Sequence, residues 1–495
     1  MNSATLNPDT LHSNCCGTAP LTARLEPWMI EAVSSSANQR LQSAVREFGS
    51  PINLLNSEPM LRNIDELNAV ADARQVPFRV FFARKANKCL TFVDAAAEAG
   101  AGIDVASEEE LRQVVERGVA GDSIICTAAI KTQSLLAACI QHNVTIAIDN
   151  DDELATVAQL VEACSIPAVS LAIRVSGFRH DGQKLFSRFG FDFDDVLPLI
   201  NSRWPAALDD VARVTGLHFH LDGYCANQRI SAIQQSLRLV PKLRQLGHEV
   251  QFLDIGGGIP MSYLDDEQQW LAFWEQLEHS LREPQTEPIT FRRHGLGLQS
   301  IDGQLRGKPN VYPFYQSPTR ADWFAKILDA PCDDQFSIAA AIRQQHLELR
   351  CEPGRSILDG CGMTVARVEF CKQHHSGDWF IGLAMNRTQC RTSSDDFLVD
   401  PIVLRNSEPS TEDPETSIEG YLVGAYCTES ELLSLRKLKF PNGIGVGDLV
   451  VFPNTAGYLM HFLESRSHQF PLAMNLVALS GEVPRFYVDA IDRSE

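Results

Sequence analysis

The sequence predicts an α/β protein built from a (β/α)8 barrel, a TIM barrel, and a second, β-rich domain. Eight short runs with high β propensity follow one another from Phe78 to Cys351, and segments with helical spacing lie between them. Such alternation is typical of a parallel sheet, and eight strands are enough to close a barrel. After Cys361 the pattern changes to strands and turns without long helical segments, which predicts the β-rich domain.

The eight runs have apolar interiors, as strands buried on both faces do. In chain order they are residues 78–83, 102–105, 123–127, 144–148, 170–175, 216–220, 251–255 and 347–351. Between them lie helical patterns such as the one formed by Leu111, Val114 and Val115, which Gly118 terminates. No internal repeat indicates another architecture.

The same patterns predict the domain boundaries. We expect residues 51–360 to form the barrel and residues 361–495 the β-rich domain. Residues 282–346 interrupt the alternation and are rich in Gly, Pro and basic residues, so we expect an insertion that serves as a lid or binding element. Residues 406–417 are acidic and rich in Ser, Pro and Thr, which predicts a solvated loop.

Composition excludes several classes of function. The 495 residues include 63 acidic and 43 basic ones, a net charge of −20, so neither nucleic acid nor a membrane surface is expected as the main partner. No apolar segment is long enough for a membrane span, and the N-terminus lacks a secretory pattern. The 13 cysteines form no CxxC pair, so no structural metal site is expected, and a reduced, cytoplasmic location is the simplest interpretation.

Ionisable residues follow the apolar interior of one predicted strand after another. In barrels of this kind the chemistry collects where strands end and the following loops begin. The residues at these ends are Lys85, Asp104, Asp149, Arg174, His220, the run 254–258 and Glu352. We expect an active site there, except that Asp149, followed by three polar residues, is expected to cap a helix.

Lys85 directly follows the apolar run 78–83. Burial of an amine disfavours its ammonium form, so we expect the pKa of Lys85 to be depressed. A neutral amine in such a place can form a Schiff base with an aldehyde cofactor. A lone lysine after a strand is ordinarily a surface residue, so this interpretation depends on a phosphate cradle and a ring partner elsewhere in the chain.

Two further segments supply those elements. In DIGGGIP, residues 254–260, three glycines allow backbone N–H groups to surround a phosphate, although a flexible turn would look the same. In CEPGRSI, Glu352 could keep a pyridine nitrogen protonated, Gly354 allows a close backbone approach and Arg355 adds a cation. His220 could stack on a cofactor ring, with a structural histidine as the rival interpretation.

Together these segments resemble a known family. RKAN, GAGIDVASEEEL, GLHFH, DIGGG, CEPGR, GAYCTESELL and TAGY, in this order, are similar to segments of the fold-type III pyridoxal 5'-phosphate (PLP) decarboxylases. That group includes the diaminopimelate, ornithine and biosynthetic arginine decarboxylases. The resemblance implies PLP as cofactor and an alanine-racemase-like barrel, with residues 1–50 joining the C-terminal β domain.

The resemblance also implies roles at matching positions. Lys85 would carry the cofactor and donate a proton, His220 would stack on the ring and Glu352 would face the pyridine nitrogen. Arg355 would bind phosphate. Cys427 would enter the site from a partner subunit and act as a catalytic residue late in decarboxylation, which makes a homodimer with shared sites the expected assembly. The other cofactor-binding positions would be Asp104, Arg174, Gly257, Gly258, Gly354 and Tyr458.

Several positions depart from the family pattern. After His220 the chain reads Leu221-Asp222-Gly223, where the family commonly has a Gly-Ser that contacts phosphate. Asp400 precedes a proline where the diaminopimelate branch has a carboxylate-binding Arg-Pro. Thr428, with Glu429 beside it, stands where an acidic residue is common.

The charge of the substrate therefore stays open in the sequence. The expected substrate-binding residues are Arg355, Asp400, Thr428 and Glu429. Asp400 and Glu431 could favour a substrate with a distal cation. Basic residues of the insertion could instead clamp an anion or a larger conjugate; they are Arg292, Arg293, Arg306, Lys308 and Arg320.

The implied activity is decarboxylation of an amino acid or amino-acid conjugate to an amine and CO2, with the ring absorbing the electrons that CO2 leaves behind. One alternative is a racemase or epimerase on the same barrel, which needs a second base on the opposite face of the ring. The Cys427 segment argues against it. The other alternative is a PLP-binding regulatory protein without turnover. The retained Lys85, Glu352, Arg355, Cys427 and Tyr458 argue against it, whereas the missing Ser and Arg-Pro leave it open.

Overall fold

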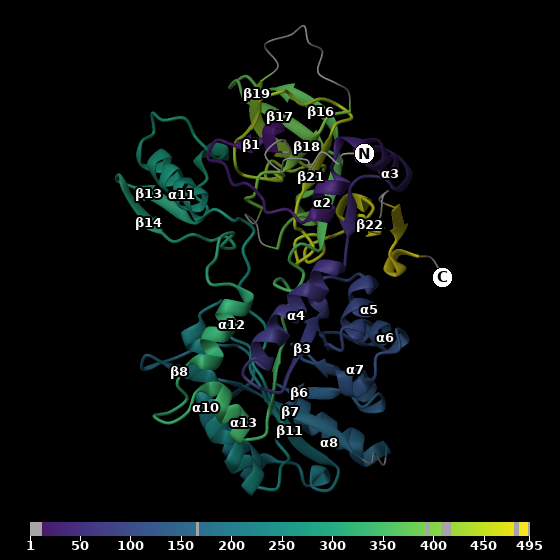
Figure 1. Cartoon of the computed structure of the whole chain (residues 1–495), viewed down its shortest axis with the longest axis vertical. Coiled ribbons are helices and arrows are strands. Elements are labelled where there is room, and N and C mark those ends of the chain that lie inside the picture. The colour runs from purple at the N-terminus through teal and green to yellow at the C-terminus, as the bar shows by residue number, and fades with distance from the viewer. Residues whose placement is uncertain (1–11, 165–167, 393–396, 407–416, 480–484, 494–495) are drawn as a thin grey trace.

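A computed structural model describes residues 12–164, 168–392, 397–406, 417–479 and 485–493. It has two regions, a barrel and a β-rich region, and the latter contains both the first and the last described strand (Figure 1). The loop predicted at 406–417 falls almost entirely outside the described residues. None of the helices in the described part combines the length and apolarity that a bilayer span requires.

The barrel is a closed sheet of eight parallel strands. The strands are β3 (Phe78–Ala83), β4 (Gly102–Val105), β5 (Ile124–Cys126), β6 (Thr145–Ile148), β7 (Val169–Ser176), β11 (Ala212–His218), β12 (Phe252–Asp254) and β15 (Glu348–Cys351). Their order around the sheet is β7-β11-β12-β15-β3-β4-β5-β6, and pairing of β6 with β7 closes it. The predicted fold class and all eight predicted strands are confirmed.

Helices surround the barrel in the regular way (Figure 1). They are α4 (Glu58–Asp72), α5 (Leu90–Glu98), α6 (Glu108–Glu116), α7 (Gln133–Gln141), α8 (Asp151–Cys164), α10 (Ala226–Gln245), α12 (Arg320–Asp329) and α13 (Ile338–Gln344). Side-chain caps begin several of them: Ser107 accepts a hydrogen bond from the Glu110 N–H, and Thr132 from that of Leu135. The loop after β7 adds β8 (Arg179–His180), β9 (Gln183–Lys184), β10 (Phe191–Asp192) and α9 (Val196–Pro198).

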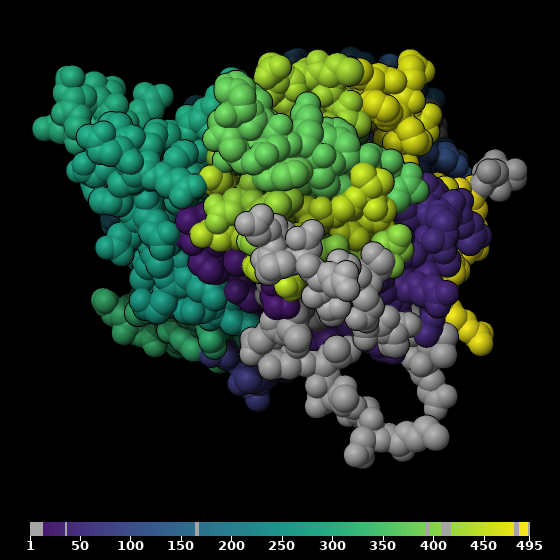
Figure 2. All heavy atoms as spheres, turned by 90° about the horizontal axis from the view of Figure 1, so that it is seen from above, coloured from purple at the N-terminus to yellow at the C-terminus, as the bar shows by residue number. Residues whose placement is uncertain are grey.

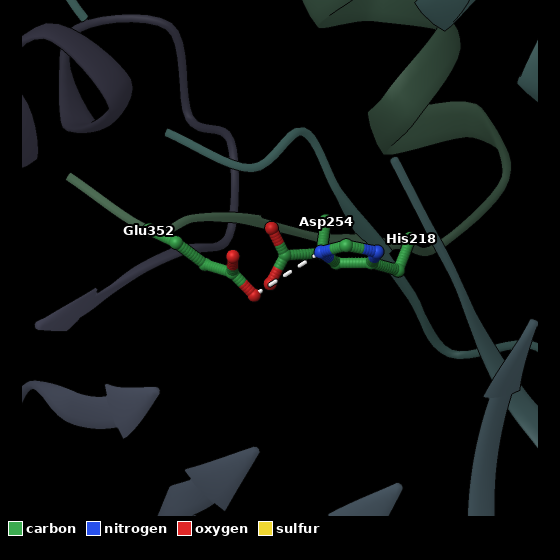
Figure 3. Close-up of side chains that lie close together, drawn as sticks. All are labelled: His218, Asp254 and Glu352. Atoms are coloured by element: carbon green, nitrogen blue, oxygen red, sulfur yellow. Dashed lines mark ion pairs between the residues drawn. The ribbon is translucent and has the colours of Figure 1, made fainter. Parts of the chain in front are cut away.

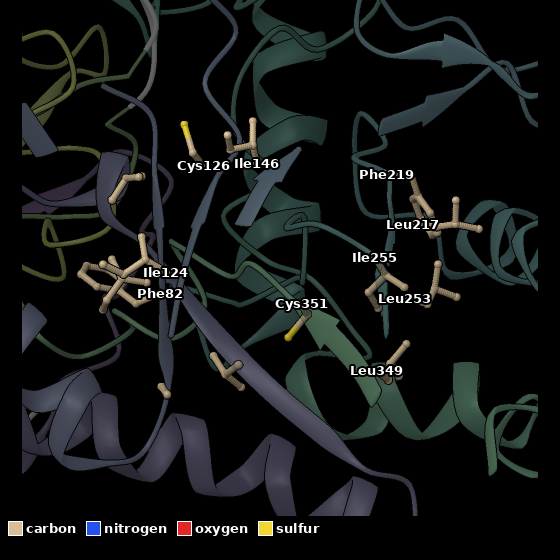
Figure 4. Close-up of a cluster of buried hydrophobic side chains, with 14 of the residues drawn as sticks. Phe82, Ile124, Cys126, Ile146, Leu217, Phe219, Leu253, Ile255, Leu349 and Cys351 are labelled. Atoms are coloured by element: carbon tan, nitrogen blue, oxygen red, sulfur yellow. The ribbon is translucent and has the colours of Figure 1, made fainter. Parts of the chain in front are cut away.

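Two layers of apolar side chains hold the barrel together. Successive residues of a strand face opposite sides of the sheet, so Phe82, Ile124 and Ile146 pack outward against the helices (Figure 4). Their neighbours form a separate inner cluster, which comprises Phe81, Ile125, Ala147, Ala172 and Phe252. The large inner rings require glycine opposite them, because a Cβ atom on Gly102 would collide with Phe81 and one on Gly216 with Phe252.

The β-rich region combines the two ends of the chain. Its strands are β1 (Cys16–Gly17), β2 (Ile52–Leu55), β16 (Gly362–Gln373), β17 (Trp379–Leu383), β18 (Ile402–Leu404), β19 (Ile418–Val423), β20 (Leu438–Phe440), β21 (Leu449–Phe452), β22 (Met474–Leu479) and β23 (Arg485–Val488). β1 pairs with β20, and β2 lies between β16 and β22. The helices α2 (Pro27–Ala32) and α3 (Ser35–Phe48) precede β2. We propose a domain boundary after Leu55, since β2 pairs within this sheet.

A segment between β12 and α12 projects to one side of the molecule (Figures 1 and 2). It contains α11 (Glu267–Arg282) and a hairpin of β13 (Leu298–Ile301) and β14 (Gln304–Gly307). The predicted insertion, 282–346, also covers α12 and α13, which pack against the barrel helices α4 and α10. We therefore propose that the projecting segment begins before residue 282 and ends before residue 320, because the apolar face of α12 belongs to the barrel core.

Candidate active site

Polar side chains face the barrel axis at the carboxyl ends of the strands. Residues two apart on a strand share a face, so the residue two positions after an inward core residue also points inward. The inward-facing ends reached in this way are Asp104, Thr127, Asp149, Arg174, His218, Asp254 and Glu352. The predicted gathering of ionisable groups at one barrel mouth thus follows from strand parity. The same parity would have identified Thr127 and His218, which the motif analysis missed.

Lys85 and Asp104 form the centre of this mouth. The Lys85 Nζ atom donates a hydrogen bond of 2.5 Å to Oδ2 of the fully buried Asp104, whose other oxygen accepts from Thr127. Burial alone would lower the pKa of Lys85, but the charges of Asp104 and Glu352 outweigh it, so the pKa lies above its ordinary value. The expected depressed pKa is therefore wrong for the chain without its cofactor.

Glu352 lies beside two further buried polar groups (Figure 3). Its Oε1 atom is 3.3 Å from Nε2 of His218, and Asp254 accepts a hydrogen bond of 2.8 Å from the Gly256 N–H. Among the described residues, Glu352 Oε1, Asp254 Oδ2 and both His218 ring nitrogens lack a hydrogen-bond partner. Burial raises the pKa of both carboxyl groups and lowers the pKa of His218.

This cluster can hold a proton close to Glu352. Its three potential ligand atoms lie within 4.8 Å of one another, which a metal ion would also require. However, the positive charges of Lys85 and Arg174 already act on Glu352 and disfavour a further cation. We interpret His218 and Asp254 as the groups behind Glu352, away from the cavity that the next residues line.

A cavity of about 260 Å3 opens beside these groups, and glycines shape its wall. Its lining includes His220, Gly258, Gly354, Arg355 and Tyr458. A Cβ atom on Gly354 would lie 2.7 Å from the Tyr458 hydroxyl. Gly258 has a φ of 72°, which disfavours any other residue there. The glycines, Lys85 and the buried carboxyl group of Glu352 together fit an aldehyde cofactor with a phosphate and a ring nitrogen.

Arg355 is held by aromatic residues of the projecting segment. Its Nη1 atom donates a 2.8 Å hydrogen bond to the Tyr263 hydroxyl, and its guanidinium stacks 4.1 Å from the ring of Tyr312. The Tyr458 ring lies on another side at 5.3 Å. Tyr263 and Tyr312 belong to no motif that indicates a site, so the sequence alone does not identify them. The segment thus contributes directly to the geometry of a predicted phosphate-binding residue.

His220 lines the cavity as a neutral ring. Burial and the charge of Lys85 lower the pKa of His220 to about 3. An uncharged imidazole can lie against an aromatic ring without placing a positive charge on it. Its position suits the predicted stacking role, and its neighbour two residues earlier, His218, belongs to the Glu352 cluster.

Arg174 pairs with Asp149, which was expected from the sequence to cap a helix. Its Nη1 atom lies 3.2 Å from Asp149 Oδ1, and its guanidinium stacks 4.2 Å from the Phe189 ring. The expected capping role of Asp149 is wrong: the Asn150 side chain accepts from the Glu153 N–H at the start of α8. Because side chains alternate along the strand, Asp149 points into the barrel, and Asn150 caps the helix instead.

Two carboxylates expected near the substrate, those of Asp400 and Glu431, form ion pairs within the β-rich region instead. Asp400 is buried, pairs with Arg436 at 2.7 Å and accepts backbone hydrogen bonds from Gly17 and Leu21. Glu431 is also buried and accepts a 2.7 Å hydrogen bond from the Arg387 N–H. We therefore correct the expectation for both residues, because neither carboxylate is free to bind a distal cation.

The segment after Gly424 is exposed. Cys427, Thr428 and Glu429 all lie at the surface, and none of them lines the cavity of their own chain. Glu429 lies 3.9 Å from Arg292, an exposed residue of the projecting segment. The geometry of a single chain thus does not bring these three predicted residues to Lys85.

The basic residues of the predicted insertion do not converge on the cavity. Arg320 lies on α12 and pairs with Glu66 and Asp359. Arg293 donates to the backbone carbonyls of Ser280 and Pro284, each at 2.7 Å. Arg306 and Lys308 are exposed on and after β14. The anion clamp expected from these side chains is therefore absent from the described structure.

Several known proteins are similar in sequence to parts of this chain. Residues 61–288 match the model of the pyridoxal-dependent decarboxylase family's pyridoxal binding domain. An uncharacterized protein, y4yA, of Sinorhizobium fredii is 29% identical over 428 residues, which cover 86% of each chain. Biosynthetic arginine decarboxylase of Pseudomonas putida is 28% identical over 33% of this chain, but the match spans only 27% of that enzyme.

A solved structure shows the same fold along almost the whole chain. Diaminopimelate decarboxylase from M. jannaschi aligns with a TM-score of 0.64 over 91% of this chain and 92% of its own, at 16% identity. The matched domain spans β3 to α11 and so includes Lys85, Asp104, Arg174 and His220, together with the glycine turn formed by residues 256–258. Residues 61–288 are thus similar to the pyridoxal binding domain of the pyridoxal-dependent decarboxylases, and the fold of almost the whole chain is that of a decarboxylase of known structure.

Proposed function

We propose that this protein is a PLP-dependent decarboxylase that releases CO2 from the α-carbon of an amino acid or amino-acid conjugate. The observation that carries the proposal is the position of Lys85 at a barrel mouth beside a cavity lined by glycines. Its amine donates a hydrogen bond to Asp104, and the charge of Glu352 also acts on it. The matched family domain supports the same activity.

PLP, when bound, supplies an aldehyde and an electron-withdrawing ring. The residues of this chain orient and charge that site. Asp104 fixes Lys85 Nζ and can take a proton from it, because the two atoms share a short hydrogen bond. Glu352, which lies beside His218 and Asp254, would keep the ring nitrogen of the bound cofactor protonated. His220 offers a neutral face for stacking.

Substrate selection depends on the groups that remain at the cavity. Asp222 lines it and is exposed, whereas Asp400 and Glu431 are buried in ion pairs. We therefore propose that a substrate with a neutral or cationic distal group binds better than one with a distal carboxylate, which Asp222 would repel. Arg355, which also lines the cavity, would instead bind an anionic group.

The exposed Cys427 supports a shared active site. We propose that two copies of the chain form a homodimer in which Cys427 and its neighbours Thr428 and Glu429 approach the cavity of the partner. A thiol can donate the proton that the α-carbon needs after CO2 has left. Exposure in the isolated chain is what such a role requires.

The test is a screen of amino acids of both chiralities for CO2 release by the purified, PLP-loaded protein, with Lys85→Ala as control. Release from at least one amino acid by the wild type, and by none with Lys85→Ala, is the expected result. A racemase would instead exchange the Cα proton with solvent deuterium without forming CO2. Release that persists in Lys85→Ala would contradict the proposal.

A further inference from the structure

Arg229, in the first turn of α10, is a buried cation, and the charge of Asp222 acts on it. Its side chain has 0% exposure, and within the described ranges no carboxylate forms an ion pair with it. Nη2 donates hydrogen bonds to three carbonyl oxygens, while Nε and Nη1 have no partner among the described residues. Burial lowers the pKa of Arg229 to about 10, which still leaves it charged at neutral pH.

The three carbonyls belong to the two loops that line the cavity. Nη2 lies 2.8 Å from the Gly257 oxygen, 3.0 Å from that of Gly223 and 3.5 Å from that of Leu221. The guanidinium also fills the space beside Gly258, where any Cβ atom would collide with it. Arg229 therefore joins the loop after β11 to the glycine turn after β12.

The opposite side of the guanidinium packs on α12. Its carbon lies 5.2 Å from the ring of Trp323, whose indole nitrogen donates a 2.8 Å hydrogen bond to the Tyr224 oxygen. A cation–π contact offsets part of the cost of burying the charge but does not neutralise it. Asp222 acts on this charge without forming an ion pair with it among the described residues, so the charge is only partly compensated, and an anion close by would be bound more tightly.

The cavity wall next to Arg229 also carries a negative charge. Asp222, between two of the carbonyl acceptors, lines the cavity and would repel an anion. Arg355 is the cation that lines the cavity itself. A doubly charged phosphate beside Gly258 would thus meet Arg355 directly and the field of Arg229 from behind the glycine turn.

We propose that Arg229 is a positioning residue for the phosphate of the cofactor: it ties the two phosphate-side loops together and supplies positive potential behind Gly258. The inference rests on the assigned cofactor and adds a residue that no motif of the sequence indicates. Arg229 does not touch the cavity, so its effect is transmitted through the loops and through its charge.

The experiment compares PLP with pyridoxal, the same aldehyde without phosphate, on the apo protein. Affinity is measured by the absorbance change on attachment to Lys85 in wild type, Arg229→Met and Arg229→Lys. Arg229→Met is expected to weaken PLP binding by about tenfold or more with little change for pyridoxal, because only PLP carries the dianion. Arg229→Lys keeps the charge and is expected to retain most of the preference for PLP.

Arg436→Met is the matched control, since it removes another fully buried arginine, in the β-rich region, and should leave both affinities unchanged. If Arg229→Met weakens the binding of PLP and of pyridoxal equally, Arg229 only holds the two loops together, and the proposal is overturned. If Arg229→Met does not fold, loss of the PLP preference in Arg229→Lys would likewise overturn it. A wild type that binds neither aldehyde would instead refute the cofactor assignment itself.

Discussion

The Lys85 ammonium and the Asp104 carboxylate share a 2.5 Å hydrogen bond at the mouth of the barrel, and the carboxylate is fully buried. The pair explains why the pKa of Lys85 is raised although burial alone would lower it. It also means that the amine must lose a proton before it can react with an aldehyde, and Asp104 is the group in contact with that proton.

Asp104→Asn should shift the pH dependence of cofactor attachment. Removing the negative charge lowers the pKa of Lys85, typically by about one to three units for a charge this close. The rate at which PLP attaches to the apo protein, followed by absorbance, is then expected to rise at a lower pH than in the wild type. Asp149→Asn, which alters the partner of Arg174, serves as control. An unchanged profile in Asp104→Asn would show that Asp104 does not set the charge of Lys85.

Lys85→Ala should abolish covalent attachment of PLP without unfolding the barrel. The wild type is expected to be yellow and to yield a Lys85 adduct by mass spectrometry after borohydride reduction. The variant should be colourless and inactive, with a circular-dichroism spectrum like that of the wild type. A reduced adduct at any other lysine would contradict the assignment of Lys85.

His220 should make the protein less stable as the pH falls. Its pKa is lowered to about 3 in the folded chain, so between about pH 6.5 and pH 3 the unfolded chain binds the extra proton. Each such proton removes about 1.4 kcal/mol of unfolding free energy per pH unit. His220→Phe keeps an aromatic ring but cannot titrate.

The thermal midpoint of His220→Phe is therefore expected to drop less than that of the wild type between about pH 7.5 and about pH 5. His461, buried and also lowered in pKa, gives the wild-type background the same trend, so only the difference between the proteins is informative. Identical losses in both proteins would mean that His220 is protonated at mildly acidic pH in the fold.

Asp400→Asn should destabilise the protein without altering its choice of substrate. The substitution leaves Arg436 buried and unpaired, which typically costs about 3–5 kcal/mol. Chemical denaturation measures the loss, and relative rates on cationic and anionic amino acids measure the choice. Asp222→Asn is the converse variant: it should leave stability nearly unchanged and improve the use of substrates with a distal carboxylate. An altered substrate preference in Asp400→Asn, without a loss of stability, would mean that Asp400 contacts the substrate.

Cys427→Ala and Lys85→Ala should complement each other in a mixed dimer. Each variant alone is expected to have little activity, but a hybrid has one site with both native residues. Random mixing of equal amounts would restore roughly a quarter of wild-type activity, because half of the dimers are hybrids with one of two sites intact. Activity that stays at the level of the separate variants would rule out a shared site.

Much of the site was visible in the sequence because it depends on local patterns. Apolar runs that end in Lys85, Asp104 and Glu352 predicted strands with functional ends, and alternation of side chains along a strand decides which of these point inward. Three glycines after 251–255 indicated a close backbone approach that the structure places at the cavity wall. These features depend on residues a few positions apart.

Contacts between distant segments were not predictable in this way. Asp400 and Arg436 lie 36 residues apart, and Arg355 is 92 residues from the tyrosine that binds it. The predicted insertion extended past the projecting segment into α12 and α13, because the helical pattern of α12 does not reveal which core its apolar face joins. Whether a carboxylate is a ligand or a buried ion-pair partner depends on which group the fold brings next to it.

By itself, the sequence determined the barrel, the β-rich region and the resemblance to the PLP-dependent decarboxylases, since periodicity and short motifs reflect how each segment packs in the core and lines the site. The tertiary structure decided the charge of Lys85, the burial of Asp400 and Glu431, and the position of Arg229 behind Gly258. The physical reason is that a pKa or a charge balance is set by every group within a few ångströms, and most of those groups come from other parts of the chain.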